Sequence, residues 1–418
     1  MIKTIVKRDG RKVPYEVSKI QDAILMAAVS VGLESSEYIA VAERIADKVD
    51  KRLQEEFNGR KSPTVEQVQD VVEAMLVSEG LVSVAKEYIL YRAERNRTRE
   101  MRADLMKIFE DLTFVDAKNA DMKRENANID ADTAMGTMLK YGSEGAKEFN
   151  HLYLLDRDVS DAHKSGDIHI HDLDFYALTE TCLQIPLDKL FEGGFSTGHG
   201  YLREPGSIRS YAALTAIALQ CNQNEMHGGQ SIPALDYYLA PGVAKTYVSE
   251  VCQVLEDRFD IDEDVKSSIK EELKGHLKSL KYHIISEEGN KVIDKILGNN
   301  GFSKENIDIV LKKALKKTEK ETYQAMEALV HNLNSMHSRA GAQVPFTSVN
   351  LGTDISEEGR MITRNLLLAT EAGLGAGETA IFPISIFKVK EGVNYNPEDP
   401  NYHLFKLACN MFSSNLLL

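Results

Sequence analysis

The four cysteines carry the side chains of this sequence that are best suited to redox chemistry. They are Cys182, Cys221, Cys252 and Cys409. No two of them stand in a Cys-x-x-Cys spacing, so the sequence supports neither a zinc site nor a disulfide framework. Unless a motif marks it out, each cysteine is expected to be a buried free thiol in a reducing compartment.

A second set of candidate residues is cationic and lies near the start of the chain. Lys7, Arg8 and Lys19 could converge on a triphosphate, because a guanidinium forks onto phosphate oxygens and an ammonium adds a compact charge. Basic residues alone favour a simpler interpretation, in which they are ordinary surface cations on a hairpin. The sequence around them has to decide between the two.

Histidine and aspartate alternate in a third segment. His169 and His171 are expected on a core strand and are followed by Asp172 and Asp174. These residue types could hold a metal ion.

A fourth segment is rich in glycine. Gly228, Gly229 and Gln230 could let the backbone approach a nucleotide, either a substrate or an effector. A tight turn between two elements explains the same residues equally well, and both interpretations stay open.

The first 100 residues or so are expected to form one compact, mostly helical unit. Asp9-Gly10 predicts the tight turn of a β-hairpin. Ser18 is expected to cap a first helix, and a second helix is expected over Glu37–Glu55.

Two more helices should complete this unit. Thr64 and Gln67 predict a capping box that opens a third helix, which Gly80 ends. A fourth helix is expected from Val84 to about Arg102, and its increasingly charged end suits a helix that leaves its domain.

Residues 101–135 are expected to form a linker, and residues 136–418 a second domain. Segments 344–351 and 380–387 look like strands with a helix over 364–371 between them, which is the spacing of a β–α–β unit. The Lys- and Glu-rich stretch at about 251–325 is interpreted as a solvated helical insertion on the surface rather than as a partner-binding face.

The bulk composition limits the classes of function. A chain of 418 residues with 43% hydrophobic residues can bury two cores. Its formal net charge of -14 disfavours nucleic acid as the main partner. We find no apolar run long enough to cross a bilayer and no secretory signal in Met1–Tyr15, so a cytoplasmic location is expected.

The N-terminal unit resembles the ATP-cone, a small regulatory domain found on many ribonucleotide reductases. The matching segments are Val6–Gly10, Pro14-Tyr15, Lys19-Ile20, Ala23-Ile24 and Ala85–Arg92. This resemblance favours the nucleotide-binding interpretation of Lys7, Arg8 and Lys19, with ATP and dATP as the allosteric effectors.

The rest of the chain resembles anaerobic, class III ribonucleotide reductases of the glycyl-radical type. The matching segments are Gly166–Asp174, Thr181–Leu183, Gly194-Phe195, Glu204-Pro205, Ser207-Ile208, His227–Ile232, Asp236, Ala240-Pro241, Gly341, Gln343, Pro345-Phe346 and Phe382-Pro383. The resemblance implies an α/β fold: a mostly helical ATP-cone, followed by an incomplete ten-stranded α/β barrel. It also implies hydrogen-bonded structural or substrate-side roles, rather than a metal site, for His169 and His171.

The resemblance implies reduction of ribonucleoside triphosphates to deoxyribonucleotides by glycyl and thiyl radicals. Cys182 matches the cysteine that helps to reduce the 2′ position. The thiyl cysteine belongs to a Gly-Cys-Arg motif that this sequence lacks, so Cys409 is only a weak substitute and a buried helical thiol is its favoured interpretation. The glycyl-radical loop and the zinc-binding Cys-x-x-Cys pairs would lie beyond residue 418, so we expect an incomplete reductase.

The resemblance also implies partners and leaves alternatives open. A radical-SAM activating enzyme and a second copy of the chain are the expected protein partners, and the reductant is either formate or a small redox protein. A chain that only senses nucleotides and dimerises, without catalysis, is the main alternative. Another glycyl-radical enzyme, such as an acyl lyase, is disfavoured because the cone ties the chain to nucleotides.

Overall fold

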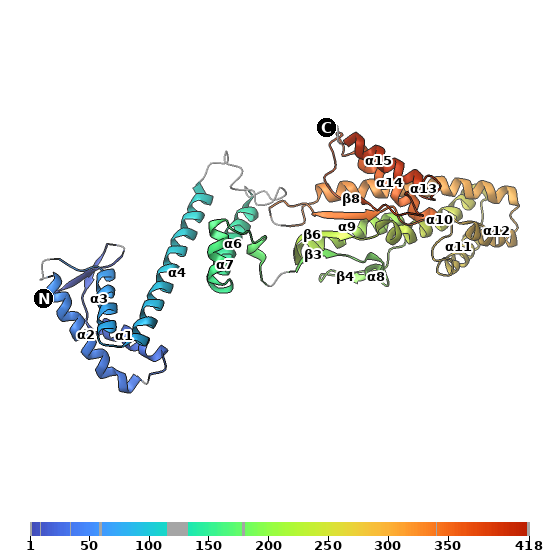
Figure 1. Cartoon of the computed structure of the whole chain (residues 1–418). Helices are drawn as coiled ribbons and strands as arrows, with labels where there is room; N and C mark the ends of the chain where they lie inside the picture. Colours follow the sequence, from blue (N-terminus) through green and yellow to red (C-terminus); the bar gives the residue numbers. More distant parts are fainter. Residues whose placement is uncertain are drawn as a thin grey trace. The chain divides into compact units, whose positions relative to one another are not determined.

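The computed structural model describes residues 2–8, 10–33, 35–57, 61–114, 133–177, 180–339 and 341–415. The contacts of the chain divide it into two compact units: residues 1–113 with 151–157, and residues 114–150 with 158–418 (Figure 1). Asp9 of the predicted turn, residues 115–132 of the predicted linker and residues 416–418 lie outside the described residues.

The first unit is a short hairpin with helices around one apolar core. β1 (Thr4–Val6) pairs antiparallel with β2 (Lys12–Pro14), and Gly10 takes a φ of +81° in the turn, so the predicted hairpin is confirmed. The helices are α1 (Ser18–Ser30), α2 (Ser35–Phe57), α3 (Val65–Ser78) and α4 (Val82–Phe114). Buried residues such as Ile24, Ile45, Val49 and Leu76 hold the helices together.

The ends of these helices confirm some predictions and correct others. Thr64 and Gln67 form the predicted capping box at the start of α3. Ser18 is the first residue of α1, and its side chain does not cap the helix, because Val17 occupies the N-cap position. Helix α4 runs well past the predicted end near Arg102, so the first part of the predicted linker is helical.

The second unit is an α/β unit. Its first helical elements are α6 (Ala134–Phe149), the π-helical turn η1 (Asn150–Leu154), α7 (Arg157–Ser165), the 3-10 turn η2 (Leu173–Phe175) and α8 (Leu187–Phe191). Residues 151–154 of η1 and Arg157 of α7 are counted with the first unit. The helices that follow are α9 (Ile208–Glu225), α10 (Leu235–Phe259), α11 (Glu263–Leu277), α12 (Glu287–Asn299), α13 (Lys304–Ser335), α14 (Glu357–Ala372) and α15 (Tyr402–Asn415). Its strands are β3 (Glu180–Gln184), β4 (Phe195–Ser196), β5 (Tyr201–Leu202), β6 (Met226–Ile232), β7 (Thr347–Leu351) and β8 (Ile384–Phe387).

Among the described residues, the main sheet has the order β3-β6-β7-β8, and each neighbouring pair is parallel. The predicted β–α–β unit is confirmed as β7, α14 and β8. Helices α9, α10, α13 and α14 pack against one another and supply most of the core of this unit (Figure 1). In β7 the alternate residues Thr347, Val349 and Leu351 are buried, so the core lies against one face of that strand.

The charged insertion folds as helices with an apolar core of their own. Leu255 of α10 packs with Ile269 and Leu273 of α11, Ile293 of α12 and Val310 of α13. The apolar face of each helix is therefore buried, which is the structural reason for the alternation of charged and apolar residues in this stretch.

The fold class predicted from the sequence is confirmed at the level of a helical N-terminal unit followed by an α/β unit. The ten-stranded barrel stays a prediction, as do the domain boundaries at residues 100 and 135. Among the described residues, we find no helix that is both long and apolar enough to span a bilayer.

Candidate functional site

The hairpin of the first unit is docked on the N-terminus of α3. The Val6 amide donates to the Pro63 carbonyl oxygen at 2.9 Å, and the hydroxyl oxygens of Thr4 and Ser62 are 2.8 Å apart. The Thr64 capping box fixes the first turn of α3 beside these contacts. The residues that follow β1 are therefore held next to the first turns of α3.

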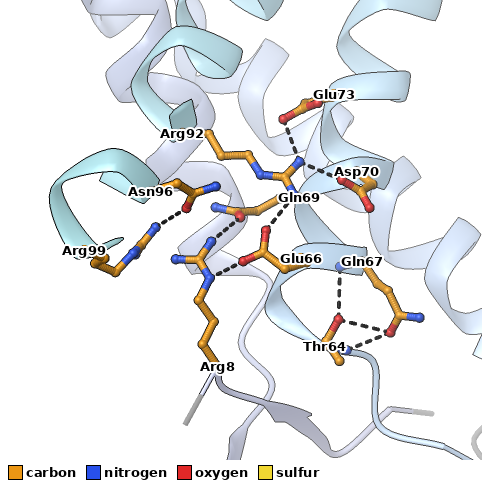
Figure 2. Close-up of polar contacts among 10 residues, drawn as sticks. All are labelled: Arg8, Thr64, Glu66, Gln67, Gln69, Asp70, Glu73, Arg92, Asn96 and Arg99. Carbon is orange, nitrogen blue, oxygen red and sulfur yellow. Dashed lines mark hydrogen bonds and ion pairs between the residues drawn. The ribbon is translucent and has the colours of Figure 1, made fainter. Parts of the chain in front are cut away.

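Arg8, at the start of the hairpin turn, points to α3 (Figure 2). Its Nε donates to Oε1 of Glu66, and its Nη2 donates to Oε1 of Gln69 at 3.1 Å. The hydrogen bond from Arg8 is the largest cause of the low pKa of Glu66, which falls to about 2 although burial opposes the shift. Glu66 is therefore a carboxylate at neutral pH.

Arg92 of α4 also binds this face of α3, and it contacts the carboxylate oxygen of Glu66 that Arg8 does not (Figure 2). Its Nη2 donates to Oε2 of Glu66 at 2.6 Å, and its Nη1 donates to Asp70 at 2.6 Å and to Glu73 at 2.8 Å. Burial alone would lower the pKa of Arg92, but its hydrogen bonds to Glu73, Glu66 and Asp70 raise it. Arg92 thus ties α4 to α3 as a permanent cation.

The other two predicted phosphate ligands are exposed. Lys7 lies in the hairpin, where its amide donates to the Arg11 carbonyl oxygen at 2.8 Å. Lys19 pairs with Glu16 at 3.0 Å, and 66% of the Lys19 side chain is exposed. Convergence of Lys7, Arg8 and Lys19 on one phosphate group stays a prediction.

Cys182 is exposed and lies on β3, which is an edge strand of the parallel sheet in the part of the chain that the structure describes. It takes a φ of +56°, a left-handed value that costs a non-glycine residue about 1–3 kcal/mol. The pairing of β3 with β6 shifts register between Thr181 and Leu183, so Cys182 is the residue of the bulge. Bulges redirect side chains and are frequent next to active sites.

The glycine segment lies on β6, opposite this bulge, and is not an isolated turn. A Cβ added to Gly228 would lie 3.2 Å from Cys182 Sγ, and one added to Gly229 would lie 3.2 Å from the Phe346 ring. Gln230 is buried, and its side-chain amide is engaged with Asn222 and with the Leu219 carbonyl oxygen. The two glycines leave space for Cys182 and Phe346. Gln230 has a structural role, because its side chain is buried and hydrogen-bonded.

His169 and His171 do not lie on a core strand, and that prediction is wrong. They are exposed residues of the irregular segment before η2. Nε2 of the buried His227 on β6 is 3.3 Å from Oδ1 of Asp172. The His227 ring also stacks on Phe175, with ring centroids 3.7 Å apart.

These residues surround a cavity of about 360 Å³ in the second unit. Its polar lining comes from Ser143, Lys147, His163, His169, His171, Asp172, Asp174, His227 and Arg339. Nδ1 of His227 is buried and has no hydrogen-bond partner among the described residues. Cys182 is not part of the lining, although Gly228, its neighbour in space, directly follows His227.

The remaining cysteines are on helices. Cys252 on α10 is fully buried, and burial raises the pKa of its thiol to about 11, as expected for an inert core residue. Cys221 on α9 and Cys409 on α15 are exposed, which corrects the expectation that they are buried. The sequence predicted that both cysteines lie on helices, but it did not predict that they lie on the exposed faces of those helices.

Residues 125–417 match the family described as "Anaerobic ribonucleoside-triphosphate reductase". The chain belongs to the anaerobic ribonucleoside-triphosphate reductase family. Residues 3–97 separately match the ATP cone domain, which agrees with a nucleotide-effector domain at the start of the chain.

Curated members of the anaerobic ribonucleoside-triphosphate reductase family align along almost the whole chain. The proteins of that name from Salmonella typhimurium and Escherichia coli are each 30% identical to it over 99% of its length. The chain spans about half the length of these relatives, 50% in both cases. A crystal structure of the anaerobic ribonucleotide reductase from Thermotoga maritima, described as a complex with dATP and CTP, has 12% identity and a TM-score of 0.43; the alignment covers 76% of this chain and 48% of that one.

Within this family member, sequence reasoning missed the carboxylates that hold the arginines. Glu66, Asp70 and Glu73 recur at helical spacing on one face of α3, and this periodicity was visible as soon as Thr64 marked the start of the helix. Their partners Arg8 and Arg92 lie far away in the sequence, so only the tertiary structure identifies them.

Proposed function

We propose that this chain contributes to the anaerobic reduction of ribonucleoside triphosphates to 2′-deoxyribonucleoside triphosphates, with Cys182 acting at the 2′ face of the ribose. Family membership supports the reaction. The observation that carries the residue assignment is the exposed Cys182 thiol, held at a bulge of β3 next to Gly228 of β6.

Replacement of the 2′-hydroxyl by hydrogen releases water and consumes two electrons and two protons. The thiol of Cys182 can donate a hydrogen atom toward this balance, and formate or a small dithiol protein would supply the rest. A glycyl radical, formed by a radical-SAM activating enzyme, would supply the hydrogen-abstracting chemistry that starts the reaction. In the part of this chain that the structure describes, the β3 bulge holds the Cys182 thiol next to Gly228.

The cavity lined by His227 and Asp172 supports a substrate-side role for this region. Its lining mixes cations with carboxylates on a protein whose formal net charge is -14. Arg339 favours an anionic group in the cavity, and the carboxylates of Asp172 and Asp174 can accept hydrogen bonds from hydroxyl groups.

The first unit would bind ATP or dATP as an allosteric effector, with Lys7, Arg8 and Lys19 as phosphate ligands. ATP would favour activity and dATP would suppress it, each by its different affinity for two states of the protein. Dimerisation with a second copy of the chain is part of the same proposal, because it would bring two effector sites into one assembly.

Two measurements test this function together. Calorimetric titration with ATP and with dATP should show saturable binding to the chain. Anaerobic incubation with CTP, the activating enzyme and either formate or a dithiol protein should then yield dCTP when this chain is joined to the thiyl-cysteine and glycyl-radical segments of a complete family member, and Cys182→Ser in that joined protein should abolish the yield. Nucleotide binding without dCTP would reduce the function to nucleotide sensing, and the absence of both would overturn the proposal.

A further inference from the structure

Glu66 holds two arginines that come from different elements of the first unit. Its Oε1 accepts from Arg8 of the hairpin, and its Oε2 accepts from Arg92 of α4 at 2.6 Å (Figure 2). One carboxylate therefore connects the predicted phosphate ligand with the helix that continues to Phe114. Nothing in the predicted nucleotide-binding pattern includes Glu66.

We propose that Glu66 is an internal competitor for the polyphosphate ligand: its carboxylate occupies Arg8 until a nucleotide triphosphate takes that arginine over. This inference rests on the proposed binding of nucleotides by the first unit and adds the residue that sets their affinity. It makes Glu66 a positioning residue, because Glu66 acts on the ligand only through Arg8.

Moving Arg8 from Glu66 to a phosphate group costs little free energy, because it leaves no charged group without a partner. When Arg8 moves to a phosphate group, Glu66 keeps its hydrogen bond to Arg92, and a charged group that retains a partner costs less than one left bare. The guanidinium of Arg8 gains an acceptor of higher charge in place of a single carboxylate.

Arg8 is also placed where a ligand can reach it. Its side chain is 31% exposed, and it lies at the turn of a short hairpin rather than inside a helix. Arg92, in contrast, is only 15% exposed and binds three carboxylates. A polyphosphate from solution would therefore draw away Arg8 and leave Arg92 in place.

The neighbouring carboxylates do not share this arrangement. Asp70 and Glu73 contact Arg92, and no contact between either of them and Arg8 is present among the described residues. Asp70 lies one turn after Glu66 on the same helix and carries the same charge. It is therefore a matched control for the general effect of removing one negative charge near the site.

The experiment is a calorimetric titration of the chain with ATP and with inorganic tripolyphosphate. Glu66→Gln should bind both ligands about threefold to fivefold more tightly than the wild type, as expected for the loss of one exposed ion pair that competes with the ligand. Asp70→Asn should change either affinity by less than about twofold, since it leaves Arg8 engaged. In the Arg8→Gln background the effect of Glu66→Gln should vanish.

The failure of this inference is distinct from failure of the proposed function. If the wild type binds neither ligand, nucleotide binding itself is overturned. If it binds ATP but Glu66→Gln and Asp70→Asn give equal affinities, or if Glu66→Gln still acts without Arg8, the competition is overturned. Should Glu66→Gln lose its helical circular dichroism, Glu66→Asp decides instead: its carboxylate is one methylene shorter, so a gain in affinity over Asp70→Asn is again expected and its absence counts against the inference.

Discussion

Cys182 Sγ lies closer than ordinary van der Waals contact to the position that a side chain on Gly228 would occupy: a Cβ added there would be 3.2 Å from the sulfur. Both residues have left-handed backbone conformations, with φ of +56° and +85°. The bulge on β3 and the glycine on β6 are thus two halves of one arrangement that presents the thiol.

The first prediction concerns Gly228→Ala. The substitution should lower the free energy of unfolding by about 1–2 kcal/mol, because alanine at positive φ is strained and its methyl group meets the sulfur. Urea denaturation measures the change. Part of the loss should disappear in a Cys182→Ala background, where the sulfur is absent.

Gly206→Ala is the control for this substitution. Gly206 has no positive φ, and an added Cβ would meet no described residue other than its chain neighbours within 4 Å, so a change within about 0.5 kcal/mol is expected. Equal losses for Gly228→Ala with and without Cys182 would contradict the contact described here.

A second prediction concerns Arg92→Gln. Arg92 is 15% exposed and neutralises Glu66, Asp70 and Glu73, so its loss leaves three neighbouring carboxylates to repel one another. The first unit should lose about 1–2 kcal/mol of stability, less than for a buried ion pair, because Asp70 and Glu66 are 63% and 38% exposed and Glu66 keeps Arg8 as a partner. Arg95→Gln, on the exposed side of α4, should change the thermal midpoint little, and similar midpoints for the two variants would refute the assigned role.

The elements of the first unit were predictable because their signals are local. The hairpin follows from Asp9-Gly10, and the start of α3 from Thr64 with Gln67, since each pattern acts within a few residues. Ser18 shows the limit of such signals: a residue that commonly caps helices is here the first residue inside one. Helix boundaries depend on packing as well as on the capping residue.

The site was harder to predict, because its contacts join distant segments. The alternation of His169 and His171 imitated a strand, yet both are exposed in an irregular segment and Asp172 turns to His227, 55 positions later. The pairing of Arg8 with Glu66 likewise depends on the docking of the hairpin on α3. Resemblance to a family located Cys182, but its bulge and its glycine neighbour required the structure.

The third prediction concerns pH and the fully buried Glu358. Burial raises its pKa from 4.5 to about 7, Oε1 accepts from the Ile285 amide at 2.8 Å, and Oε2 has no partner among the described residues. The folded state thus binds this proton more tightly than the unfolded state. Stability from this group is fully present below pH 4.5 and is lost as the pH rises to about 7.

Glu358→Gln removes this proton and its pH dependence. Relative to the variant, the wild type should lose about 3 kcal/mol between pH 4.5 and 8, from 1.36 kcal/mol per unit of pKa, as measured by urea denaturation across that range. Glu357→Gln, whose side chain is 53% exposed, should follow the wild-type profile. Parallel profiles for the wild type and Glu358→Gln would show that Glu358 is ionised in the folded state.

The most direct test of the central claim is protection of Cys182 from alkylation by a ribonucleoside triphosphate. The chain is treated anaerobically with iodoacetamide, with and without saturating CTP, and the modified cysteines are quantified by peptide mass spectrometry. Cys221 and Cys409 are exposed on helices and serve as internal references. The account predicts that CTP slows the alkylation of Cys182 severalfold and leaves the two references unchanged; an equal rate at Cys182 with and without bound CTP would contradict it.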